Sequence, residues 1–84
     1  MKKMNWFELW MQDKESIYNT MKRNMQADLE AGYDPNGAAI TTQRNMIADY
    51  MRDIVERVDF FVNLPNQSAV NRWCYNDMKR RGII

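Results

Sequence analysis

Residues 47–62, IADYMRDIVERVDFFV, carry the most regular pattern in this 84-residue chain. Apolar side chains recur there at steps of three and four residues, which is the spacing of one face of an α-helix. The charged side chains fall on the opposite face, where Arg52 can pair with Glu56 and Asp53 with Arg57 across one helical turn. The pattern therefore predicts an amphipathic helix whose apolar stripe is Ile47, Tyr50, Met51, Ile54, Val55, Val58, Phe61 and Val62.

Turn and capping residues set the limits of this helix and of its neighbours. Thr41 or Thr42 suits the N-cap. Before them, the segment AGYDPNG (residues 31–37) ends a preceding helix, because Gly32 suits a left-handed C-terminal position and the residues after it favour turns. After the helix, Pro65 disfavours helical geometry at the residue before it. Helices are therefore predicted over residues 6–30, 42–63 and 67–81.

The two outer helices have apolar stripes of their own. In the first, Asn5 and Glu8 resemble a capping box, while the polar run around Asp13 leaves open whether a second helix begins there. In the third, the stripe is Val70, Trp73, Cys74 and Met78, and Gly82 closes the helix. The predicted fold class is all-α: one domain over residues 1–84, a small three-helix bundle of two long antiparallel helices with the shorter C-terminal helix packed across them.

The composition excludes several kinds of chemistry. The chain has no histidine and a single cysteine, so it lacks the usual neutral-pH base, an internal disulfide and the ligands of a structural zinc site. Its glycines, at positions 32, 37 and 82, do not form a phosphate-binding loop. Cys74 lies on an apolar stripe, where a thiol is usually a buried hydrophobe. We expect no enzymatic activity, no cofactor and no metal site.

The chain is also expected to be cytoplasmic. Asn5 and Glu8 interrupt the apolar residues near the N-terminus, and a secretion signal would have a continuous apolar region there. No segment approaches the length of a membrane span. A single cysteine fits a reducing compartment.

Two surfaces are candidates for binding a partner. Trp6 and Trp10 belong to a cluster that makes the start of the first helix apolar nearly all round, so we expect both to meet another protein or a second copy in a homodimer. On the third helix a second set of side chains projects away from the apolar stripe: Arg72, Tyr75, Asn76, Lys79 and Arg80.

The basic residues at the end of the third helix have two interpretations. Lys79, Arg80 and Arg81 lie in the last turn, where positive charge opposes the negative end of the helix dipole. This role needs no partner. The net charge of the whole chain is only +1, so a broadly basic nucleic-acid surface is not expected, although the positive charge does gather at this end.

Residues 68–84, SAVNRWCYNDMKRRGII, resemble the recognition helix of a winged helix-turn-helix domain, which commonly runs Ser-x-x-Val-x-Arg, then a basic pair, a glycine and an apolar end. The resemblance lies in Ser68, Val70 and Arg72, the later basic pair, Gly82 and the apolar end. The resemblance implies a DNA-binding transcriptional regulator. Gln67, Asn71, Arg72 and Tyr75 would then lie towards the DNA groove, with Lys79 and Arg80 on phosphate groups.

The whole chain also resembles, in its style, the small accessory proteins of bacteriophages that infect Gram-positive bacteria. It is short, helical and rich in Met and Asn, and it ends in the aromatic and basic helix WCYNDMKR (residues 73–80). Such proteins often bind and block a host factor, and anti-CRISPR proteins are one group of them. This resemblance implies a non-catalytic inhibitor or modulator of a host protein or protein–nucleic-acid complex, and the resemblance to a winged helix implies the alternative, DNA-binding regulation.

Overall fold

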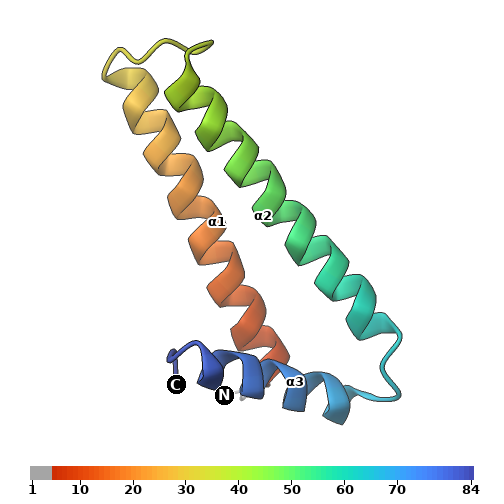
Figure 1. Ribbon diagram of the computed structural model, residues 1–84. Coiled ribbons are helices and arrows are strands. Elements are labelled where there is room, and N and C mark those ends of the chain that lie inside the picture. The colour runs from red at the N-terminus through yellow and green to blue at the C-terminus, as the bar shows by residue number, and fades with distance from the viewer. Residues whose placement is uncertain (1–4) are drawn as a thin grey trace.

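The computed structural model describes residues 5–84 and confirms the all-α prediction (Figure 1). Helices α1 (Trp6–Glu30) and α2 (Ala38–Val62) run antiparallel as a long hairpin, and α3 (Gln67–Arg80) lies across its open end. The bundle is elongated: its radius of gyration is 16.0 Å, whereas a compact domain of this length would have about 12 Å. Residues 1–4 of the predicted single domain lie outside the described residues.

The first helix has the predicted limits, and α2 begins earlier than predicted. Helix α1 continues without a break through Asp13. Helix α2 starts at Ala38 instead of Thr42, with Gly37 as an N-cap that makes no side-chain hydrogen bond. Sequence reasoning chose a threonine because its hydroxyl can cap a helix. Here the turn is already closed by the Gly37 N–H, which donates to the Asp34 carbonyl oxygen at 2.9 Å.

The end of α3 follows the glycine motif that the sequence predicts. Gly82 has a φ of +78°, and its N–H donates to the Lys79 carbonyl oxygen at 3.1 Å. The Ile83 N–H donates to the Met78 carbonyl oxygen at 3.0 Å. These two bonds satisfy carbonyl groups that a helix end would otherwise leave free, so α3 stops at Arg80 with Arg81 as its C-cap.

The core lies at the end of the hairpin that α3 crosses. Its buried members come from all three helices, and they are Trp10, Phe61, Val70, Cys74 and Met78. Aromatic rings meet there edge to face, with 5.2 Å between the ring centroids of Trp10 and Phe61. The row of apolar residues predicted for α2 is only partly buried: Ile54 and Phe61 are covered, while Met51, Val55 and Val62 are exposed. Helix α1 covers only the side of this row that carries Ile54 and Phe61.

The start of α1 is held by α3 as well as by its own cap. The Glu8 N–H donates to Asn5 Oδ1 at 2.8 Å, as the capping-box pattern predicts. The Phe7 N–H donates to Asn71 Oδ1 at 3.1 Å, although Asn71 lies 64 residues further along the chain. Backbone N–H groups in the first turn of a helix have no partner within the helix. Asn71 therefore caps α1 from a different helix.

We expect Asn71→Ala to lower the free energy of unfolding by about 1 kcal/mol, because losing a capping side chain typically costs that much. Urea denaturation followed by circular dichroism measures this change. Asn76→Ala is the matched control, since Asn76 is exposed on the same helix and should change stability by less than about 0.5 kcal/mol. Equal losses in the two variants would contradict the capping role.

Candidate partner-binding site

The outward face of α3, together with Trp6, forms one continuous surface. Arg72, Asn76, Lys79 and Arg80 are exposed, and Tyr75 is half-buried. The ring of Trp6, which is 38% exposed, meets the ring of Tyr75 edge to face with 4.9 Å between centroids. Six of the seven side chains predicted to bind a partner thus lie on what we call the α3 face: Trp6, Arg72, Tyr75, Asn76, Lys79 and Arg80.

The α3 face is positively charged. The one acidic residue of α3, Asp77, is 7% exposed and points inward. Lys79 Nζ lies 5.9 Å from the centroid of the Tyr75 ring. Among the described residues, no carboxylate forms an ion pair with Arg72 or Lys79. Two cations of this face therefore remain free to meet an external acidic group.

The seventh predicted residue, Trp10, does not lie on the α3 face, because it is a core residue. It is 2% exposed, and its indole Nε1 donates to Asp77 Oδ2 at 3.0 Å. Helix α3 crosses the hairpin at this level and covers the ring. Periodicity within α1 showed an excess of apolar side chains at its start, but it did not show which of them α3 would bury.

Asp77 accepts hydrogen bonds from three side chains around it. Besides Trp10, Arg80 donates to one carboxylate oxygen, and Arg81 Nε donates to the other at 3.0 Å. Arg81 also pairs with Asp13 of α1 at 3.2 Å. Burial alone would raise the pKa of Asp77, but the hydrogen bonds from Trp10 and Arg80 and the charge of Arg81 outweigh it and lower the pKa. Two of the three basic residues at the end of the chain therefore have a partner inside the molecule.

Since the pKa of Asp77 is lowered in the folded chain, its stabilising effect is complete above the unfolded value of about 4 and is lost as the pH falls below it. We expect Asp77→Asn to lower the free energy of unfolding by about 2–3 kcal/mol at pH 7. The loss should shrink as the pH falls towards 2, where the wild-type carboxylate is also protonated.

Urea titrations from pH 7 to pH 2 on wild type and variant measure this convergence. Asp53→Asn is the control, because Asp53 is exposed and its loss should be small at every pH. A difference between wild type and Asp77→Asn that stays constant with pH would show that the charge of Asp77 does not matter.

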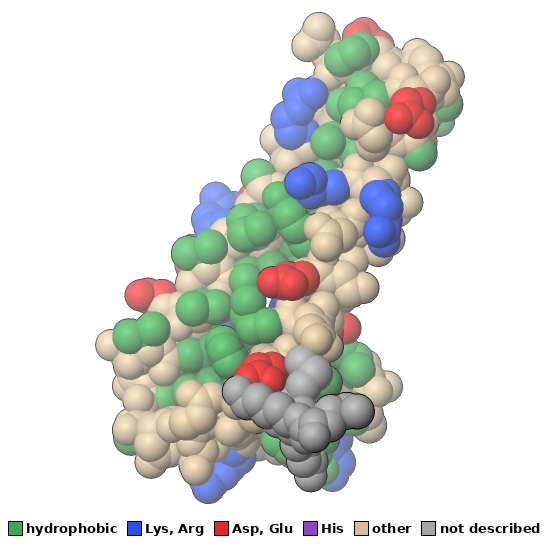
Figure 2. Space-filling view, turned by 180° about the vertical axis from the view of Figure 1, so that it is seen from behind, with side chains coloured by type: hydrophobic (Ala, Val, Ile, Leu, Met, Phe, Trp, Pro, Cys, Tyr) green, Lys and Arg blue, Asp and Glu red, His purple; other side chains and the backbone are tan. Residues whose placement is uncertain are grey.

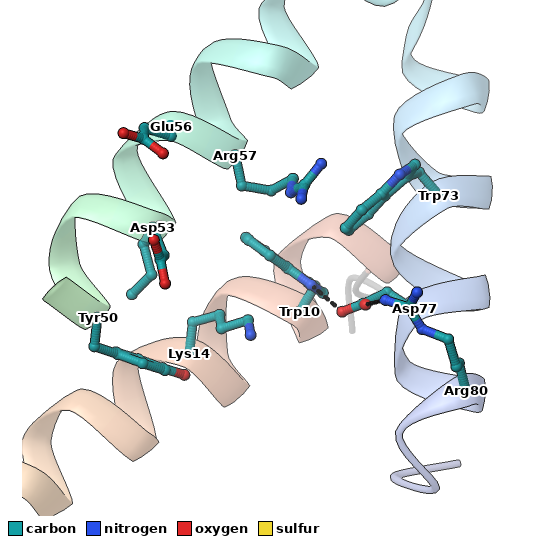
Figure 3. A pocket seen from close by; sticks show the side chains of 10 residues that line it. Trp10, Lys14, Tyr50, Asp53, Glu56, Arg57, Trp73, Asp77 and Arg80 are labelled. Carbon is teal, nitrogen blue, oxygen red and sulfur yellow. Dashed lines mark hydrogen bonds and ion pairs between the residues drawn. The ribbon is translucent and has the colours of Figure 1, made fainter. Parts of the chain in front are cut away.

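A cleft of about 540 Å³ lies between the three helices, beside the α3 face (Figure 3). Aromatic rings and charged side chains of both signs line it, the carboxylates being those of Asp53, Glu56 and Asp77, and two cations lie over the rings of Trp10, Tyr50 and Trp73. Lys14 Nζ is 5.3 Å from the centroid of Trp10 and 5.5 Å from that of Tyr50. The guanidinium of Arg57 is 4.4 Å from the centroid of Trp73. Such contacts attract a cation to the ring face.

Arg57 differs from its predicted place. The sequence assigned it to the solvent-exposed face of α2 in a pair with Asp53, whereas it is half-buried over Trp73. Likewise Arg52 pairs with Asp49 and not with Glu56. No described carboxylate forms an ion pair with Lys14 or Arg57. Burial, followed by the charge of Arg81, lowers the pKa of Lys14, so its ammonium group lacks the stabilisation that a paired lysine would have.

Tyr50 contributes a further unpaired group to the lining. Its hydroxyl oxygen is buried, and no described residue hydrogen-bonds to it. Burial, followed by the charge of Asp13, raises the pKa of Tyr50, so the hydroxyl remains protonated at neutral pH. A buried donor without an acceptor costs free energy.

We therefore expect Tyr50→Phe to increase the free energy of unfolding by about 1 kcal/mol, because it removes the unpaired hydroxyl and keeps the ring. Thermal denaturation would show a melting temperature several degrees higher, since about 1 kcal/mol shifts the midpoint by about 4–8 °C in a domain of this size. Tyr18→Phe is the comparison for a half-buried tyrosine elsewhere on the hairpin. A lower melting temperature for Tyr50→Phe would mean that the hydroxyl stabilises the fold.

Cys74 occupies the position that its apolar stripe predicts. It is fully buried, and burial, with a smaller effect of Asp77, raises the pKa of its thiol to about 11. The thiol is therefore protonated at neutral pH, and a protonated thiol is a poor nucleophile. Within residues 5–84, no three side chains of His, Cys, Asp or Glu lie together as metal ligands.

Comparisons with known proteins do not narrow these possibilities. No protein-family model matches the chain, and no similar curated protein or solved structure was found. None of the helices over residues 5–84 has both the length and the apolar character needed to cross a membrane.

Proposed function

We propose that this chain is a non-catalytic binding protein that docks its α3 face and the adjoining cleft on an acidic surface of another protein. The observation that carries the proposal is the unpaired charge of this region. Arg72, Lys79, Lys14 and Arg57 form no ion pair within the described residues. Carboxylates of a partner protein would form ion pairs with these cations.

The aromatic residues of the α3 face favour a protein partner. The rings of Trp6 and Tyr75 pack against each other on this face, and both are partly accessible. Tryptophan, tyrosine and arginine are the residues that most often contribute the binding energy of protein interfaces. The cleft between Trp73 and Tyr50 adds a recess in which a partner side chain would be enclosed.

Two contacts count against DNA binding in the manner of a winged helix. Asn71, which that resemblance would place towards the groove, has its side-chain oxygen engaged by the Phe7 N–H of α1. Arg80, which it would place on phosphate, forms an ion pair with Asp77. Fewer side chains are then free for base edges and phosphates than the resemblance implies.

The biological role that we propose is inhibition or modulation by occupancy. A small helical protein without a catalytic group can act by covering an acidic site that a host protein or a protein–nucleic-acid complex uses. The resemblance to small bacteriophage accessory proteins, anti-CRISPR proteins among them, supports this role.

Affinity capture from bacterial lysate tests the proposal with three forms of the chain: wild type, Tyr75→Ala and Arg80→Ala. We expect wild type to retain a protein after nuclease treatment. Tyr75→Ala should lose most of it, because truncating a central aromatic anchor typically costs about 2 kcal/mol or more, roughly thirtyfold in affinity. Arg80→Ala should keep most of it, because Arg80 is already paired within the chain.

The opposite result would favour the DNA-binding alternative. In that case nuclease would remove the bound protein, and the pure chain would bind duplex DNA with an affinity that falls steeply with salt. Replacing Arg80 would then reduce the salt slope by about one unit per lost phosphate contact.

A further inference from the structure

Helix α2 carries a second apolar surface that the described part of the chain covers only in part. We call it the α2 stripe, and it consists of Met51, Val55, Val58 and Val62. Met51 is 37% exposed, Val55 58% and Val62 77%, and Val58 is half-buried. Figure 2 shows hydrophobic side chains running along α2 on the face seen from behind. The successive steps of four, three and four residues are those of a coiled-coil seam.

The shape of the molecule explains why this surface remains open. The molecule is 47 Å long, and its principal core lies at the end of the hairpin that α3 crosses. One helix cannot cover an apolar arc as wide as that of α2. Helix α1 packs on the side of Ile54 and Phe61, which are buried, and leaves the adjacent side to solvent. A contiguous apolar patch of this kind marks an interaction site.

The charges beside the α2 stripe indicate what covers it. Arg52 and Asp59 are both exposed and lie on the same flank of the stripe, since seven residues correspond to about two turns. In the single chain Arg52 forms a solvent-exposed ion pair with Asp49, and such a pair contributes little free energy, so the guanidinium can exchange Asp49 for another carboxylate. They are about 10 Å apart along one helix, so they cannot pair with each other. Opposite charges on one flank become complementary when an identical helix packs in the reverse direction.

We propose that the α2 stripe is the interface of a symmetric homodimer in which α2 packs antiparallel against α2 of a second copy. A twofold axis between Val55 and Val58 sets Met51 opposite Val62 of the other copy. Arg52 then lies near Asp59 of the other copy, displaced by two residues, or about 3 Å, which an arginine side chain can span. The symmetry repeats each contact, so two such ion pairs flank the seam.

Charge reversal tests both the dimer and its direction. We expect sedimentation velocity to show that wild type dimerises with increasing concentration. Arg52→Glu and Asp59→Lys, each alone, should weaken dimerisation about tenfold, because two attractive pairs become repulsive. An equimolar mixture of these two variants should recover the wild-type affinity as a heterodimer, since each pair is then again of opposite sign.

Lysine substitutions test the apolar contact itself. Val55→Lys and Val62→Lys should be monomeric with unchanged helical circular dichroism, because both side chains are exposed in the single chain. Met46→Lys is the matched control: Met46 is 56% exposed on the same helix but lies off the stripe, so this variant should still dimerise.

Three outcomes would overturn the proposal. They are a wild-type chain that stays monomeric at all concentrations, equal effects of Val55→Lys and Met46→Lys, and a mixture of the charge variants that does not form a heterodimer. None of these results depends on the α3 face. The homodimer proposal can therefore be wrong while the proposed function is correct, and the proposed function can be wrong while the homodimer proposal is correct.

Discussion

The hydrogen bond from Trp10 to Asp77 is the interaction on which the arrangement of the three helices depends. A carboxylate that is 7% exposed is costly to bury unless donors surround it. The donors come from α1, in Trp10, and from the end of α3, in Arg80 and Arg81. Satisfying Asp77 therefore fixes where α3 crosses the hairpin. The same crossing buries Trp10, completes the core and forms one wall of the cleft.

This arrangement divides the basic side chains into two groups. Arg80 and Arg81 neutralise Asp77, and Arg81 also reaches Asp13. Arg72 and Lys79 face outward, while Lys14 and Arg57 lie over aromatic rings beside the cleft. The first group explains why the basic end of the chain need not bind anything. The second group is positive charge that the described part of the chain leaves without an ion pair, and the proposed docking on an acidic surface rests on it.

The sequence predicted local structure well, because helical period, caps and the glycine motif depend on neighbouring residues. The limits of α1, the apolar stripe of α3 and the stop at Gly82 follow from such signals. Contacts between helices were not predictable in the same way. Burial of Trp10, the turn of Arg57 towards Trp73 and the capping of α1 by Asn71 all depend on the angle at which α3 crosses.

The start of α2 was missed for a different reason. Gly37 is the N-cap of the helix and has no capping side chain, so no Ser, Thr, Asp or Asn in the sequence marks this start. The cleft was missed as well, because Lys14, Tyr50 and Trp73 come from three separate helices and share no motif. A hint was present in the first case: the turn residues end at Gly37, directly before Ala38.

The capping of α1 by Asn71 has a consequence for the order in which the chain folds. The first turn of α1 is synthesised long before α3. The acceptor of its Phe7 N–H, the side chain of Asn71, is added 64 residues later. Contacts of such high sequence separation form slowly, because a long loop has to close first. The hairpin of α1 and α2 can thus form while only the local cap by Asn5 holds the first turn of α1. Only when the last helix docks does the first one become complete.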